Sequence, residues 1–149
     1  MSIYKNSIAS KQYIEPLPTK TMTGSAVTIK TINLETFGAI ESIAAVIADA
    51  QLTGTCVVTW YGGTTTGGGT LTAIAAITLP NADPTTGVIQ IDAEDIVEAA
   101  EVAALLPAGF KSLVLKATGT NTDTFDVCLV ANTHHKYVGL TPSAVSALT

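Results

Sequence analysis

The stretch LLPAGFKSLVLKATGTNTDTFDVCLV (Leu105–Val130) holds two apolar runs joined by a short polar segment. Pro107 and Gly109 are typical of the point where a helix ends and the chain changes direction. Apolar residues dominate 111–117 and recur at every second position over 124–133, which is the pattern of β-strands with a buried face. The Gly, Asn and Asp residues between the runs favour a hairpin connection. The stretch therefore predicts a β-protein, and its apolar content indicates packing rather than chemistry.

Similar short patterns occur earlier in the chain. The strands predicted from alternation and β-branched residues are 26–34, 56–61, 71–79 and 88–92. A change of phase near Lys30–Thr31 indicates a β-bulge or a bend, and the glycine-rich segment 62–69 predicts the tip of a hairpin. Together with the opening stretch, about seven strands at turn spacing predict an antiparallel β-sandwich of jelly-roll or Greek-key type.

The segment Phe37–Ala50 fits two structures. Ile40 and Ile47 share one face of a helix, while the continuous apolar run 43–48 equally suits a strand that is buried on both sides. We favour the strand, because the following segments are β and Gly54 lies within a hairpin's reach.

The segment Ala93–Leu106 breaks the β pattern and predicts one short inserted helix of about three turns. Asp92 suits its N-cap, and the helix dipole favours the acidic residues of its first turn. Four acidic residues are expected on a solvated face of this helix: Glu94, Asp95, Glu98 and Glu101.

Three regions are expected along the chain. Residues 1–25 show no sustained period, and Pro16–Pro18 favour extended backbone, so this segment is predicted to be an extended N-terminal arm. The β-sandwich domain is expected over 26–140, and residues 141–149 form a C-terminal tail rich in small residues.

The composition narrows the class of function. The 149 residues are 47% hydrophobic and only 13% charged, with a formal charge of −5. A surface this poor in charge favours association with other chains. Seven Lys and Arg residues in total are too few to neutralise several phosphates, so we expect no nucleic-acid partner. No apolar run reaches the length of a membrane span, and the first residues lack the pattern of a signal peptide, so we expect synthesis in a cytoplasm and no membrane partner.

Residues that carry out chemistry are few. Cys56 and Cys128 each lie in an apolar run and are expected to be buried free thiols. His134 and His135 are adjacent, so on a strand they point to opposite faces and are poorly placed to share a metal ion. We expect no catalytic, cofactor-binding or metal-binding residues, and no enzymatic activity.

Trp60 and Tyr61 are neighbours on a predicted strand. Aromatic faces bind sugars in lectin-like modules, so this pair is an alternative glycan-contact site. A single Trp in an apolar strand is more often part of a core, and we favour that interpretation.

The opening stretch also carries a resemblance. Its Leu-Pro-Ala-Gly-Phe lead, apolar strand, Thr-Gly-Thr-Asn turn and second apolar strand resemble small virion proteins of tailed bacteriophages, namely capsid decoration (cement) proteins with a jelly-roll-like β-sandwich. The close match covers about a sixth of the chain. The helix predicted over 93–106 is longer than this family leads us to expect.

The resemblance implies a mechanical role and no catalytic residues. Such a protein binds the outside of a phage capsid through the major capsid protein, as a homo-oligomer, with a trimer favoured and a dimer possible, and stabilises the shell. The expected location is the capsid exterior of the virion. We expect the apolar residues of the arm to contact the partner, namely Ile3, Tyr4, Ile14 and Leu17. The alternatives are a carbohydrate- or host-surface-binding sandwich, or a structural protein of the phage tail or neck.

Overall fold

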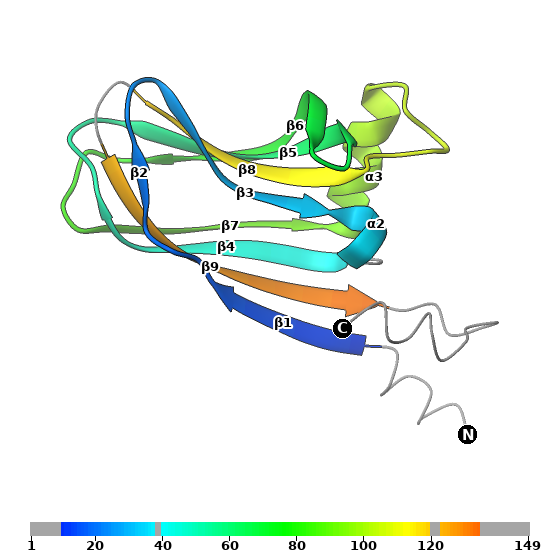
Figure 1. Ribbon diagram of the computed structural model, residues 1–149, viewed down its shortest axis with the longest axis horizontal. Helices are drawn as coiled ribbons and strands as arrows, with labels where there is room; N and C mark the ends of the chain where they lie inside the picture. The colour runs from blue at the N-terminus through cyan, green and yellow to red at the C-terminus, as the bar shows by residue number, and fades with distance from the viewer. Residues whose placement is uncertain (1–9, 38–39, 120–122, 135–149) are drawn as a thin grey trace.

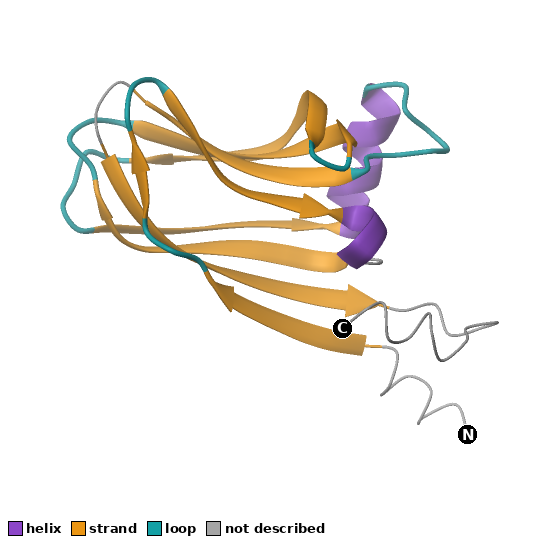
Figure 2. Cartoon of the chain, viewed as in Figure 1, coloured by secondary structure: helices purple, strands orange, loops and turns teal. Residues whose placement is uncertain are grey.

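Two antiparallel β-sheets face each other in the computed structural model, which describes residues 10–37, 40–119 and 123–134 (Figures 1 and 2). The described strands are β1 (Ser10–Pro16), β2 (Lys20–Met22), β3 (Ala26–Asn33), β4 (Ile40–Gln51), β5 (Cys56–Thr65), β6 (Gly68–Leu79), β7 (Thr85–Asp92), β8 (Ser112–Gly119) and β9 (Asp123–His134). The described helices are α2 (Leu34–Phe37) and α3 (Ala93–Val102). The predicted mainly-β antiparallel sandwich is confirmed.

The order of the strands defines the topology. The first sheet has the order β1-β9-β4-β7, with β2 pairing the start of β9, and the second has the order β3-β8-β5-β6. The pairs β1–β9, β3–β8, β4–β7 and β5–β6 are all antiparallel and are nested in the sequence. Nested pairs arise when one long hairpin is rolled up, which is the jelly-roll arrangement.

The core lies between the two sheets and follows from alternation along each strand. The residues at alternate positions of β4, β5, β8 and β9 are fully buried, and Trp60 and Phe125 are the largest of them. The Trp60 indole N–H donates a hydrogen bond to the carbonyl oxygen of Ile89, at 3.2 Å. The polar tip of this ring is therefore satisfied inside an apolar interior.

Two local predictions from periodicity are confirmed. The ambiguous segment forms a strand, β4, from Ile40 to Gln51. In β3 the register against β8 shifts between Thr28 and Lys30, beside the predicted bulge. The register shift places Ile29 and Ile32, an odd number of residues apart, both in the core.

Helix α3 begins where the sequence predicts and ends earlier. Asp92 and Asp95 form a reciprocal capping box, in which each side chain accepts a hydrogen bond from the backbone N–H of the other. The helix stops at Val102 rather than at Leu106, because Ala104 adopts a left-handed backbone with φ of 57°. The four acidic residues of this helix are exposed, as expected.

The predicted hairpin within the opening stretch is wrong. Strand β8 belongs to the second sheet and β9 to the first, so the connection between them crosses from one sheet to the other. The same turn-forming residues suit either geometry.

The glycine-rich hairpin between β5 and β6 is present, but two of its glycines lie in strand β5. The ring of Phe110 lies on Gly62, where an added Cβ would be 2.3 Å from a ring carbon. The carbonyl oxygen of Gly63 accepts a hydrogen bond from the N–H of Lys111, at 2.9 Å. Phe110 and Lys111, which follow α3, therefore contact β5 at Gly62 and Gly63, where a larger residue would clash.

The segment predicted to be an arm contains β1 and β2, which pair with β9. Its backbone is extended, but from Ser10 onward it is part of the first sheet. Glu15 of β1 forms a salt bridge of 3.0 Å with Lys30 of β3 and so links the edges of the two sheets. Residues 1–9 and the predicted tail, 141–149, lie outside the described residues. In the part of the chain that the structure describes, neither helix has the length and apolar character to cross a bilayer.

Candidate interaction surface

The outward face of the first sheet carries apolar side chains in two neighbouring rows across its strands. The register places Ile14 beside Val130 in one row, which continues through Ala44 and ends at the polar, exposed Gln90. In the other row Pro16, Cys128, Val46 and Val88 follow one another across β1, β9, β4 and β7. We call these residues the outer patch: Ile14, Pro16, Val46, Val88, Cys128 and Val130.

The outer patch is open to solvent in the single chain. Ile14 is 62% exposed and Val88 is 57% exposed, while Val46, Cys128 and Val130 are half-buried. At its edge lies a shallow hollow of about 260 Å³. A contiguous apolar area on a soluble surface is typical of an interaction site.

Polar residues border the outer patch at both ends. On one side Asn132 donates a side-chain hydrogen bond to the Ser42 hydroxyl, at 3.0 Å. On the other side the Thr19 hydroxyl donates to the carboxylate of Asp126. An apolar centre with a polar, hydrogen-bonded border is the usual arrangement of a protein–protein interface.

The outward face of the second sheet differs in character. Its register brings Thr28, Lys116 and Thr59 into one row. The Lys116 ammonium lies 5.9 Å from the ring centroid of Tyr61. In this row Thr28 is exposed, Lys116 is half-buried and Thr59 is buried. The row is polar, whereas the matching rows of the first sheet are mostly apolar, so the two faces of the sandwich are not equivalent.

Strands β4 and β9 explain how the outer patch arises. In β9, Val127 and Leu129 point into the core while Cys128 and Val130 point out, so both faces are apolar. The run 43–48 of β4 shows the same property. Strands with apolar residues on both faces are typical of sheets covered on both sides, and the second sheet covers only one face of the first among the residues that the structure describes.

The two cysteines lie in different environments. Cys56 is fully buried, and burial raises the pKa of its thiol from 9.0 to about 11, with the negative charge of Asp123 acting in the same direction and a backbone hydrogen bond at Thr118 opposing it. Cys128 is half-buried, in the middle of the outer patch. Both are free thiols, but the expectation that both are buried holds only for Cys56.

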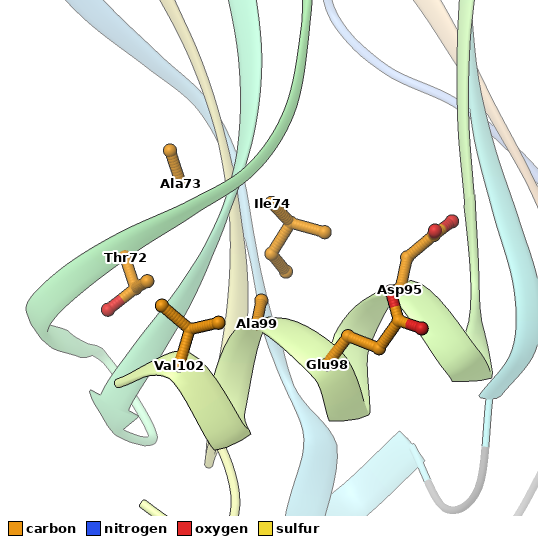
Figure 3. A pocket seen from close by; sticks show the side chains of 7 residues that line it. All are labelled: Thr72, Ala73, Ile74, Asp95, Glu98, Ala99 and Val102. Atoms are coloured by element: carbon orange, nitrogen blue, oxygen red, sulfur yellow. The ribbon is translucent and has the colours of Figure 1, made fainter. Parts of the chain in front are cut away.

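A second hollow, of about 230 Å³, lies between α3 and β6 (Figure 3). It is lined by Thr72, Ala73 and Ile74 from the strand and by Asp95, Glu98, Ala99 and Val102 from the helix. The Asp95 carboxylate is engaged in the helix cap. Within the described residues, no group of three His, Cys, Asp or Glu side chains is placed to hold a metal ion.

The structure places the predicted partner-contact residues in different environments. Ile14 lies in the outer patch, whereas Leu17 is half-buried, packs against the core and donates its N–H to the carbonyl oxygen of Val127. Ile3 and Tyr4 lie outside the described residues.

The alternative glycan-contact pair is separated by the structure. Trp60 is fully buried and Tyr61 is half-buried on the outward face of the second sheet. Adjacent residues of a strand point to opposite faces, so the two rings do not form one platform. The preferred interpretation of Trp60 as a core residue is confirmed.

The sequence reasoning missed most of the outer patch, including Val46, Val88 and Val130. The sequence held one indication of the outer patch: the continuous apolar run 43–48 suits a strand that is buried on both sides. The sequence does not show which of the two faces turns inward.

Comparisons with known proteins give a fold and no family. No family model and no curated protein matches this sequence. A protein of the disulfide-linked pili of Bacillus endospore appendages aligns over 86% of this chain and 90% of its own, with 14% identity and a TM-score of 0.55. A protein of T=1 particles derived from infectious bursal virus aligns over 91% of this chain, with 13% identity and a TM-score of 0.50, and this chain spans only 34% of its length.

An SPBc2 prophage-derived protein aligns over 82% of this chain with 9% identity and a TM-score of 0.44. The first two likenesses show that this chain shares its sandwich fold with proteins of pili and of virus particles.

Proposed function

We propose that this chain is a non-enzymatic structural protein of a virion, which binds the outside of a phage capsid as a decoration or cement protein and stabilises the shell. The observation that carries the proposal is the outer patch. Strands β4 and β9 have apolar residues on both faces, and within residues 10–37, 40–119 and 123–134 no element covers the outward one. A sandwich of this kind is suited to work as one layer of a larger assembly.

Repeated contacts between an oligomer and a symmetric shell strengthen the binding of each copy. Each apolar contact contributes about 25 cal/mol per Å² removed from water. An oligomer that meets a symmetric shell through several copies binds with an avidity greater than one contact supplies. Modest surfaces on each copy therefore suffice to add interface area between shell subunits.

Two further observations support a virion. The opening stretch resembles phage decoration proteins, and the fold is shared with a protein of virus-derived particles. The proposed partner is the major capsid protein, and the proposed oligomer is the trimer or dimer that capsid symmetry accommodates. The proposed location is the capsid exterior.

Electron microscopy of source particles that carry a tagged copy of this chain tests the proposal. We expect label on the shell at regular positions. Label confined to the tail or neck would support a tail or neck structural protein instead, and particles without the chain would overturn a virion role.

The part of the arm that precedes β1 is the proposed capsid contact, through Ile3 and Tyr4. Because β1 begins at Ser10, deleting residues 1–9 removes no residue of a described strand. We expect this deletion, and the double substitution of Ile3 and Tyr4 by Ser, to lower the occupancy of capsids. Substitution of Asn6 and Ser7 by Ala in the same segment is the matched control. Unchanged occupancy in the deletion would exclude the arm as the contact.

A second candidate function is the subunit of a fibre. The likeness to the endospore-appendage protein covers nearly all of that protein, and it favours this candidate over glycan binding, for which Trp60 is inaccessible. Negative-stain microscopy of the purified chain at high concentration separates the two. Long filaments without any capsid would favour the fibre, and discrete oligomers would favour decoration.

A further inference from the structure

We propose that the outer patch is a homodimer interface, in which a second copy of this chain packs its first sheet face to face against the same sheet about a two-fold axis near Cys128. The inference deepens the proposed function and rests on it only in that the chain works within an assembly. In Figure 1 the first sheet forms one outer layer of the molecule, formed by β1, β9, β4 and β7, and α2 and α3 lie toward one end of the sandwich.

The chemistry of the outer patch suits a copy of itself. Its six side chains carry no formal charge, so a two-fold axis brings no like charges together at the centre. The nearest acidic group on this face, Asp126, stands at the border and is hydrogen-bonded to Thr19. A partner of strongly acidic or basic chemistry finds no complementary charge among these residues.

The symmetry follows from the geometry of one flat face. Contact between identical surfaces is isologous, and only a two-fold axis places a surface against itself. A three-fold axis would instead join two different surfaces of each copy. The outer patch therefore points to a dimer rather than to the trimer that the family resemblance favours.

The area is sufficient for a weak dimer. Four strands spaced by about 4.8 Å span about 19 Å, and the six residue steps between the borders at Asp126 and Asn132 span about 20 Å, so the face covers roughly 400 Å². A pair of copies then buries roughly 800 Å², an area that suits a weak, transient interface rather than a permanent one. We expect a weak dimer, which forms fully only where copies are held at high local concentration.

Cys128 provides a direct probe of this arrangement. It stands in the row between Pro16 and Val46, so an axis through the middle of the outer patch places it near its symmetry mate. Packed sheets lie about 10 Å apart, so the facing thiols are spaced for a bismaleimide with a spacer of about 8 Å rather than for a direct disulfide. Cys56 is buried and serves as the internal control.

Sedimentation velocity of the purified full chain between roughly 1 and 200 µM tests the proposal. We expect a monomer–dimer equilibrium in the wild type. Val88→Lys and Ile14→Lys each place two like charges in the interface and should weaken the dimer by at least about tenfold. Both side chains are largely exposed in the single chain, so the fold is expected to persist. Thr28→Lys, on the outward face of the second sheet, is the matched control and should leave the equilibrium unchanged.

Cross-linking gives an independent result. The bismaleimide should join copies of the wild type and of Cys56→Ser, and should not join copies of Cys128→Ser. A wild type that stays monomeric at 200 µM, a trimer, or lysine variants that dimerise as the wild type does would each overturn the proposal. If the wild type is monomeric and the lysine variants lose capsid occupancy, the shell covers the outer patch instead. The experiment contains no capsid, so its failure leaves the proposed virion role to be decided by microscopy.

Discussion

Replacing Gly62 by alanine tests how the opening stretch is anchored to the sandwich. The new Cβ would lie 2.3–2.4 Å from three ring carbons of Phe110, whereas ordinary carbon contacts are about 3.5–4.0 Å. The ring therefore has to move by about 1 Å. It is only 8% exposed, and the neighbouring Lys111 N–H is hydrogen-bonded to Gly63, so little free space is available for that movement.

We expect a net loss of about 1.3 kcal/mol in the free energy of unfolding. Overpacking of this kind costs about 1–3 kcal/mol, and the reduced freedom of the unfolded chain returns about 0.4–1 kcal/mol. Urea unfolding, followed by the fluorescence of Trp60, should show a midpoint lower by about 0.7 M with an unchanged slope.

Two controls make this prediction specific. Gly67 has nothing within 4 Å of its added Cβ, so Gly67→Ala should change stability by less than about 0.5 kcal/mol. In a Phe110→Ala background the Gly62→Ala substitution should cost almost nothing, because the obstructing ring is gone. An equal cost in both backgrounds, or a Gly62→Ala variant as stable as Gly67→Ala, would refute the reasoning.

Three further predictions concern the core and the helix cap. Asp92→Ala should lower the free energy of unfolding by about 1 kcal/mol, because the N-cap of α3 loses its hydrogen-bond acceptor. Asp92→Asn keeps an acceptor oxygen and should retain most of this stability, as measured by urea unfolding. Iodide should quench the emission of Trp60 far less in the folded chain than in 8 M urea, because the ring is fully buried; equal quenching would place the indole at the surface. Stability should also fall as the pH rises from 9 to about 11, because the unfolded chain then releases the Cys56 proton that the folded chain keeps. Below pH 9 this contribution is fully present, and the loss amounts to about 2–3 kcal/mol for a shift of this size. In Cys56→Ala the free energy of unfolding should fall less between pH 9 and 11, by the amount that the thiol contributes. Identical pH profiles of stability in the wild type and in Cys56→Ala would contradict this prediction.

Features encoded by short-range periodicity could be predicted from the sequence. The sandwich class, the strand nature of β4, the bulge in β3 and the Asp92 cap all depend on residues within one element. The early end of α3 could not be predicted from the sequence. It depends on the left-handed backbone of Ala104, a conformation that alanine rarely adopts.

Features that depend on distant partners escaped prediction. Strands β1 and β2 exist because they pair with β9, more than a hundred residues away, and their own sequence shows little alternation. The same is true of β8 and β9, whose connecting residues suit a hairpin but join two sheets. For the candidate site, Ile14 was predicted on apolar character alone, while Val46, Val88 and Val130 required the strand register.

The ladder between β1 and β9 has a mechanical consequence. Ser10 stands opposite His134, so the described chain enters and leaves the sandwich on a single rung of that ladder (Figure 1). A load that pulls Ser10 and His134 apart breaks the hydrogen bonds of the ladder one after another, so only one or two of them bear the load at a time. A load along the strands has to break the whole row together. The β1–β9 ladder should therefore resist a load along its strands and yield to a load that separates Ser10 from His134.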